Sequence, residues 1–316
     1  MKFYKIWDRF GIYILTLIVL FGFAIAAPSI LSGTNINNMF AQMTMTAIAG
    51  AGMTFCITSG GFDLSVGSIL SMTAVFIAQN MKNGMMPGIA ILLAFGIAAV
   101  FGVFNGLVIT KIKVPTFITT LATMKLFKGF ALLYSQGKPT VLTTFTYFKW
   151  LTQGRILGIN VSIWIMAIVF VIAFLVYFNT KFGVNVRAIG SNEQAARLSG
   201  VNVNRVLIAV FVITAITAAI AGLLYCSQLL KGEATLGDGF ELDVICVTVV
   251  GGTSLAGGRG KIIGTLVAAF LVQVIRTGIN LLGFGEATRY LFLGGILLIV
   301  IAINGLQHIK EKSIDV

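Results

Sequence analysis

Apolar residues run through this chain in long blocks, separated by short polar or glycine-rich segments. A helix needs about 20 mostly apolar residues to cross the hydrocarbon core of a bilayer. The blocks therefore predict an all-α membrane bundle, a single transmembrane domain over residues 1–316. We expect about ten transmembrane helices, at 11–27, 41–58, 64–81, 87–110, 115–134, 157–179, 206–228, 243–258, 262–283 and 289–306. The segment 243–258 is the weakest of them, because it is short and contains four glycines.

Composition leads to the same class. Of 316 residues, 58% are hydrophobic and 10% are charged, whereas a soluble domain carries about 25% charged residues. A surface this poor in polar groups excludes a soluble enzyme, a disordered chain and a collagen-like fibre.

The net charge of +12 would suit a nucleic-acid partner, but the basic residues sit in short clusters between uncharged runs, which indicates a lipid bilayer and no nucleic acid. With ten helices and the N-terminus in the cytoplasm, thirteen of the 22 Lys and Arg residues fall inside and six outside. This bias follows the positive-inside rule. Both termini are therefore predicted to be cytoplasmic.

The first apolar run follows Lys2, Lys5 and Arg9 and ends in Ala24-Ile25-Ala26, as in a signal peptide with its cleavage site. The run is longer than a typical signal core, and further apolar runs follow it. We therefore favour a retained signal anchor.

The longest predicted cytoplasmic loop covers about 180–205 and contains the signals of a short helix. Ser191 and Gln194 have the spacing of a capping box, and Gly200 is a C-terminal stop. Glu193 and Arg197 are four residues apart and can pair on one face. Isolated helices of two turns are marginal in water, so we expect this helix to dock on a partner; a solvated linker helix is the alternative.

A glycine-rich segment interrupts the apolar stretch from 41 to 81 and contains Gly60, Gly61, Asp63, Ser65 and Gly67. A charge at the bilayer centre costs about 2.5–3.5 kcal/mol or more. Asp63 either caps the helix that follows it or belongs to a broken helix beside a translocation pathway.

Three basic residues, Lys125, Lys128 and Arg276, fall within predicted helices. The same cost of an unpaired charge applies to them. We expect them to face the bundle interior, where they either pair with acidic residues or contact a substrate.

A second glycine-rich segment, 251–261, superficially resembles a phosphate-binding loop. That motif requires glycine five residues before Gly260 and Ser or Thr after Lys261, where this chain has Leu255 and Ile262. Any ATP hydrolysis must therefore reside in another chain. The single histidine, His308, and three scattered cysteines (Cys56, Cys226 and Cys246) suggest neither a metal site nor catalysis.

Three long motifs together resemble the membrane subunits of bacterial ABC sugar importers, particularly the ribose-type permeases. They are Ser59-Gly-Gly-Phe-Asp-Leu-Ser-Val-Gly-Ser68, the run Ala188–Val203, and Glu241-Leu-Asp243 with Val249–Gly264, and they occur in the family's order over nearly the whole chain. In the family's coupling loop, the resemblance matches Gly190, Asn192, Ala195, Ala196 and Gly200. It also matches the family's aspartate to Asp63 and its basic residue before a glycine to Lys128-Gly129. Ribose permeases have a more Asn-rich pattern near 273–280 than this chain, in which Arg276 stands.

The resemblance implies a permease of the bacterial cytoplasmic membrane that works as a pair, identical or mixed. An ABC ATPase subunit that binds ATP-Mg would drive it, and an extracytoplasmic sugar-binding protein would supply ribose or a related monosaccharide. The permease itself would bind no cofactor and catalyse no reaction. The segment Ser191–Gly200, with Glu193, Gln194 and Arg197, would be the coupling helix in the ATPase cleft. A branched-chain amino-acid permease of the same superfamily and an ATP-independent secondary transporter are the alternatives.

Overall fold

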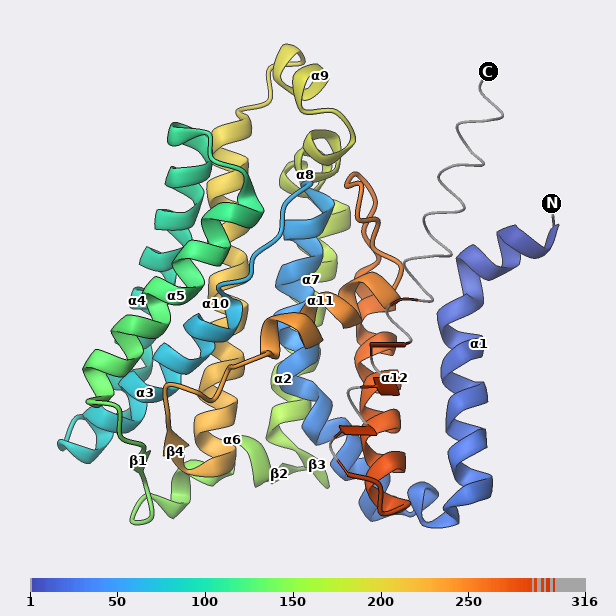
Figure 1. The fold of residues 1–316 in the computed structure, drawn as a ribbon, viewed down its shortest axis with the longest axis vertical. Coiled ribbons are helices and arrows are strands. Elements are labelled where there is room, and N and C mark those ends of the chain that lie inside the picture. Colours follow the sequence, from blue (N-terminus) through green and yellow to red (C-terminus); the bar gives the residue numbers. More distant parts are fainter. Residues whose placement is uncertain (1, 286, 289–290, 293, 296–297, 299–316) are drawn as a thin grey trace.

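The computed structural model describes residues 2–285, 287–288, 291–292, 294–295 and 298, and of residues 2–9 it describes only the backbone. The described part is a bundle of helices whose long members run roughly parallel to one another (Figure 1). The predicted helix at 289–306 lies largely outside the described residues, as do Arg289 and His308.

Helices make up most of the described chain. In chain order the helical elements are α1 (Lys2–Ala26), η1 (Pro28–Leu31), α2 (Gly33–Thr58), α3 (Val66–Lys82), α4 (Pro87–Leu107), the π-helical turn η2 (Val108–Ile112), α5 (Thr116–Ser135), η3 (Thr146–Lys149), α6 (Trp150–Gln153), α7 (Val161–Asn179), α8 (Lys181–Ser191), α9 (Glu193–Leu198), α10 (Val203–Leu229), α11 (Phe240–Val250) and α12 (Ile262–Leu281).

Two short antiparallel strand pairs, one of them a hairpin, lie at one end of the bundle, opposite the end that carries α8 and α9 (Figure 1); we call it the hairpin end. Strand β1 (Thr140–Val141) pairs with β4 (Lys231–Gly232), and β2 (Arg155–Ile156) pairs with β3 (Ile159–Asn160).

Among the described residues, six helices are long and apolar enough to cross a membrane: Gly33–Thr58, Pro87–Ile112, Thr116–Ser135, Val161–Asn179, Val203–Leu229 and Ile262–Leu281. The apolar part of α1, Phe10–Ala26, is shorter, and α3 has 17 residues. The prediction of an all-α membrane bundle is confirmed, whereas the expectation of ten full membrane-spanning helices is supported for only some of them.

The predicted transmembrane helix at 243–258 is wrong. The helix α11 has 11 residues, which at 1.5 Å per residue is about half of the ~30 Å hydrocarbon core. It ends at Val250, and the glycine-rich segment that follows is loop. In Figure 1, α11 lies at mid-height in the bundle, and the loop after it rises toward α8.

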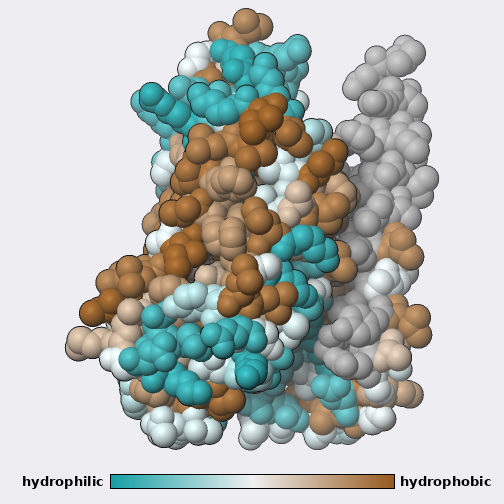
Figure 2. Space-filling model, turned by 60° about the vertical axis from the view of Figure 1, so that its left-hand side comes forward, coloured by the Kyte–Doolittle hydropathy of each residue, from teal (hydrophilic) through white to brown (hydrophobic). Residues whose placement is uncertain are grey.

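The helices α2 and α10 form the centre of the bundle. From Met43 to Thr58 every residue of α2 is buried, whereas α4 exposes large apolar side chains such as Leu92 and Val100. Apolar exposure on outer helices is the expected result where lipid takes the place of water. Figure 2 shows this hydrophobic surface at mid-height, with hydrophilic side chains at the end of α8 and α9 and again in the lower half of the face.

Candidate functional site at the α8–α9 end

The helix α9 is capped at both ends, as the loop sequence predicted, but its first residue differs. Asn192, not Ser191, is the N-cap: its side-chain Oδ1 accepts a hydrogen bond from the Ala195 backbone N–H at 3.0 Å. The predicted capping box at Ser191 is therefore wrong. Ser191 is instead the last residue of α8, an 11-residue helix that we did not predict.

The C-terminal stop and the ion pair are confirmed. Gly200 has a φ of +83°, and the N–H of Val201 donates to the carbonyl of Ala196 at 3.1 Å, which is a Schellman ending. Arg197 donates to Glu193 Oε1 at 2.9 Å. This pair is more than half exposed, so it contributes little to stability.

The two adjacent alanines of the loop point in different directions. Ala195 is exposed with most of α9, including Gln194, whereas Ala196 is buried and packs inward. Leu198, which no motif in the sequence singled out, has a side chain that is 90% exposed at the tip of α9. A large apolar side chain this exposed in a polar loop is the residue type that fills a pocket on a partner.

The α8–α9 unit is fixed to the bundle by close backbone packing at Gly190. A Cβ at Gly190 would overlap the Thr58 carbonyl oxygen and lie 2.5 Å from the Gly258 backbone nitrogen. That nitrogen donates a hydrogen bond to the same Thr58 carbonyl at 2.8 Å. The end of α2, the end of α8 and the glycine-rich loop before α12 therefore meet at one point. Gly190 belongs to this internal joint, not to the exposed surface of α9.

Arg187 holds α8 on the end of α7. Its guanidinium donates to the Tyr177 carbonyl at 3.0 Å and lies 5.1 Å from the centre of the Tyr177 ring. Tyr177 is fully buried, and its hydroxyl donates to Thr58 Oγ1 at 3.4 Å. A displacement of α8 would therefore move the ends of α7 and α2 with it.

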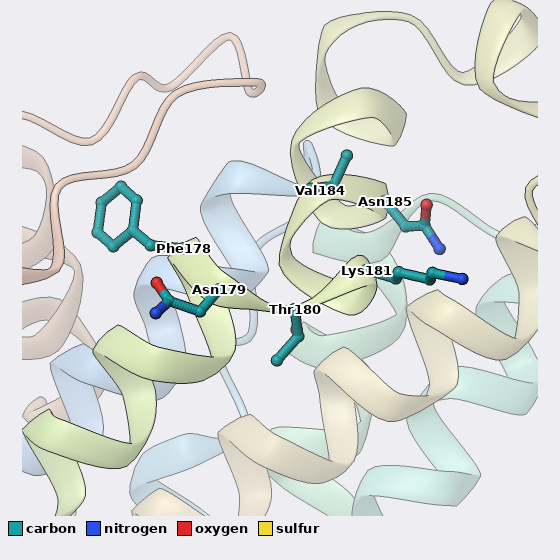
Figure 3. A pocket seen from close by; sticks show the side chains of 6 residues that line it. All are labelled: Phe178, Asn179, Thr180, Lys181, Val184 and Asn185. Carbon is teal, nitrogen blue, oxygen red and sulfur yellow. The ribbon is translucent and has the colours of Figure 1, made fainter.

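A cleft of about 370 Å³ lies where α7 turns into α8 (Figure 3). It is lined by Phe178, Asn179, Thr180, Lys181, Val184 and Asn185. Lys181 and Asn185 point to the same side, and Phe178 points away from them (Figure 3). The Thr180 hydroxyl caps α8 by accepting a hydrogen bond from the Gly183 N–H at 3.3 Å. The cleft therefore places a basic side chain, Lys181, and several polar ones beside the α8–α9 surface.

Asp63 lies in the segment between α2 and α3 and is fully buried. Its Oδ1 accepts hydrogen bonds from the Ser65 backbone N–H at 2.9 Å and the Ser65 hydroxyl at 2.6 Å. The Ser65 hydroxyl in turn accepts from the Asn105 amide at 2.9 Å. This geometry is an Asx turn that leads into α3. The N-cap of α3 is Ser65, which has no side-chain cap hydrogen bond, so the expectation that Asp63 itself caps this helix is wrong.

The glycines around Asp63 have different structural reasons. Gly60 has a φ of +86°, which turns the chain back after α2. Gly61 lies against α5, where a Cβ would be 3.2 Å from Thr116. Gly67 packs against the backbone of Gly237, so a Cβ there would overlap the Gly237 carbonyl. A role of this segment in a translocation pathway stays a prediction.

The three basic residues within helices have different surroundings. Lys128 forms an ion pair with Asp238 at 2.6 Å, and Arg276 forms one with Asp243. Both acidic partners come from the segment 233–243 that leads into and begins α11. Lys125, by contrast, is exposed on the surface of the chain. The expectation that it faces the bundle interior is wrong for the single chain.

The start of this acidic segment is tied to β4. Lys231 pairs with Glu233 at 2.5 Å, and the Thr235 hydroxyl donates to the same carboxylate at 3.0 Å. These hydrogen bonds lower the pKa of Glu233 below its usual value. Within the described ranges, no three His, Cys, Asp or Glu side chains are grouped as metal ligands.

Comparison with known proteins decides the family. A family model described as the permease component of a branched-chain amino acid transport system matches residues 35–301. The chain belongs to this family of ABC-importer permeases. The permease is therefore a multi-pass membrane transport protein, and a helical bundle is the architecture expected of such a protein.

Three relatives of the chain are named as permeases for sugars. The permease is 40% identical over 301 residues to the ribose import permease protein RbsC of Bacillus subtilis, which covers 95% of this chain and 92% of the relative. It is 33% identical to the L-arabinose transport system permease protein AraH of Escherichia coli, over 99% of this chain and 95% of the relative. It is also 34% identical to the galactose/methyl galactoside import permease protein MglC of Haemophilus influenzae, over 94% of each. No solved structure matches the chain significantly.

Proposed function

We propose that this chain is the membrane-spanning subunit of an ATP-driven importer for ribose or a related monosaccharide in the bacterial cytoplasmic membrane. The observation that carries the proposal is the exposed, capped helix α9, joined to the bundle at Gly190. A helix that presents Leu198 to solvent and is rigidly connected to α2 and α12 suits the transmission of force from a partner.

The α8–α9 end is proposed to be cytoplasmic. It carries Lys181, Arg187, Arg197 and Arg205, and cytoplasmic loops are enriched in such residues. In Figure 1, α1 also begins on this side of the bundle. Ten passes with both termini inside remain our proposal, with the loop 251–261 and α11 together making one pass that is only partly helical.

Coupling follows from the joint at Gly190. An ATPase subunit that holds ATP-Mg and closes on its nucleotide would move α9 as a rigid body. Because Gly190 contacts backbone atoms of Thr58 and Gly258, with no flexible side chain between them, the movement passes directly to α2 and the start of α12. Rigid-body motion of this kind alternates access to a central site.

A second permease copy is proposed to cover the charged face formed by Lys125, Lys128, Asp238 and Glu241. Lys125 is in the middle of α5, one of the helices able to cross the membrane. An exposed charge at that depth is costly against lipid. A partner copy, identical or paralogous, with a polar pathway between the two would remove this cost.

The hairpin end is proposed to receive the sugar-binding protein outside the cell. The exposed side chains of Tyr147, Trp150 and Leu157 lie in this region, and aromatic residues are frequent anchors in protein interfaces. The permease itself would bind no cofactor.

Two alternative functions are less well supported. A branched-chain amino-acid permease would share the architecture, but the relatives quoted above are all named for sugars. A secondary transporter would have no use for an ATPase-docking helix.

The test is a pull-down of the tagged permease from native membranes in mild detergent, with partners identified by mass. We expect an ABC ATPase in near-equal amount. Recovery of the permease alone, under conditions that preserve other membrane complexes, would overturn the proposal.

A further inference from the structure

A polar cavity of about 180 Å³ opens between α2, α10 and α12, in the half of the bundle away from α8 and α9. Apart from Met45, the side chains that line it can form hydrogen bonds: Gln42, Tyr225, Gln228, Gln273, Arg276 and Asn280. All three helices are able to cross a membrane. Gln273 and Arg276 lie within α12, where polar side chains are costly and in general have a function. Gln228 and Asn280 stand in the last turns of α10 and α12 beside them.

The amides in this cavity are only partly satisfied. Gln273 is 4% exposed, and its amide donates to Gln42 Oε1 at 3.0 Å and to Thr277 Oγ1 at 3.3 Å. The amides of Gln228 and Asn280 have no hydrogen-bond partner in the part of the chain that the structure describes. Each amide can donate and accept, as can each hydroxyl of a sugar.

Charge in the cavity is balanced. The guanidinium of Arg276 pairs with Asp243 of α11, while its buried Nε has no hydrogen-bond partner. The positive charge is therefore neutralised, but an N–H donor is left over. A neutral ligand with hydrogen-bonding groups suits this arrangement better than an anion or a cation, because either ion would compete with the existing pair.

Tyr225 adds an apolar ring to the lining. Its ring meets the edge of Phe240 with the centroids 5.9 Å apart and an interplanar angle of 87°, which fixes its orientation. Small-ligand sites combine an apolar surface with a few placed polar groups, and sites for drug-sized ligands have volumes above about 300 Å³. The smaller cavity here matches a smaller ligand.

We infer that this cavity is a binding subsite for a neutral monosaccharide, recognised through its hydroxyl groups by Gln228, Gln273, Arg276 and Asn280. The inference rests on the proposed function for the direction of transport and the class of ligand. Beyond the proposed function, the inference locates a site within one permease chain that binds the sugar, and selects it, during transport.

The test uses the complete transporter in proteoliposomes, with D-ribose, L-arabinose and D-galactose as probes. A double variant, Gln228→Met with Asn280→Leu, replaces two amides by apolar side chains of similar size. The matched control is Gln153→Met, an exposed amide in α6 outside the cavity. We expect the double variant to reduce initial uptake about tenfold, while hydrolysis of ATP stimulated by the binding protein stays at the parental rate. The control should match the parent in both measurements.

The outcomes separate the two claims. If the parent imports one of the sugars and the double variant imports it equally well, the subsite is overturned and the proposed function stands. If the parent imports none of the three sugars, both the subsite and the proposed function are refuted. Where the double variant does not assemble with its ATPase, the single Asn280→Leu variant replaces it, because Asn280 is exposed; an uptake loss of about threefold is then expected, and parental uptake would overturn the subsite.

Discussion

Gly190, near the end of α8, packs directly against the backbone carbonyl of Thr58, the last residue of α2, and the same carbonyl accepts a hydrogen bond from Gly258. These three residues are separated by more than 60 positions in the sequence. Their meeting connects the candidate coupling unit to the helix at the centre of the bundle.

The substitution Gly190→Ala should destabilise the permease, because a methyl group would overlap backbone atoms that cannot rotate away. We expect a loss of about 1–3 kcal/mol, as for overpacked sites, seen as a lower midpoint of thermal unfolding in detergent. Gly96→Ala is the matched control, since a Cβ at this exposed position of α4 meets no atom within 4 Å. Equal midpoints for the two variants would refute the close packing.

The substitution Leu198→Asp should abolish recovery of the ATPase without altering thermal stability. Leu198 is 90% exposed and makes little contact within the chain, so its loss should affect only a partner surface. Leu157→Asp, at an 88% exposed leucine in the hairpin end, is the control and should retain the ATPase. Normal ATPase recovery with Leu198→Asp would rule out α9 as the main docking element.

The substitution Asp63→Asn should leave uptake nearly unchanged, because an amide oxygen can accept the two Ser65 hydrogen bonds that Oδ1 now accepts. Asp63→Ala removes the acceptor of both hydrogen bonds, leaves buried donors of Ser65 without a partner, and should cost about 1–3 kcal/mol. Initial uptake and thermal stability are measured for both variants. A folded Asp63→Asn protein that no longer transports would show that the carboxylate acts in the pathway.

The ion pair between Lys128 and Asp238 should tolerate reversal of its charges. Lys128→Glu alone places two carboxylates together and should reduce uptake strongly. Adding Asp238→Lys restores an attractive pair and should recover much of the activity, as a double-mutant cycle would measure. A double variant no better than Lys128→Glu would mean that Lys128 acts on something other than Asp238.

The sequence predicted the long helices well, because charge-free runs set their limits. The run 87–110 became Pro87–Leu107, and 206–228 became Val203–Leu229. The prediction failed at 243–258, where apolar composition outweighed the glycines that end α11. It also began α2 too late, because polar residues from Thr34 to Asn38 form its first turns and are anchored by the Ser32 cap.

At the candidate site, the sequence predicted features that depend on neighbouring residues, but it did not predict contacts between distant segments. The stop at Gly200 and the Glu193–Arg197 pair depend on neighbours a few residues away. The N-cap was misplaced by one residue because Ser191 and Asn192 are both good capping residues, and the unpredicted helix α8 takes Ser191 as its end. The joint of Gly190 with Thr58 and Gly258, and the ion pairs of Lys128 and Arg276, depend on chain segments that only the folded bundle brings together.

Uptake into proteoliposomes that contain the permease and its ATPase tests the central claim most directly. Radiolabelled D-ribose is supplied outside with the binding protein, and ATP-Mg is enclosed inside. We predict accumulation above the external concentration that requires both ATP inside and binding protein outside. Ribose entry at the same rate without ATP would contradict the account and indicate a secondary transporter.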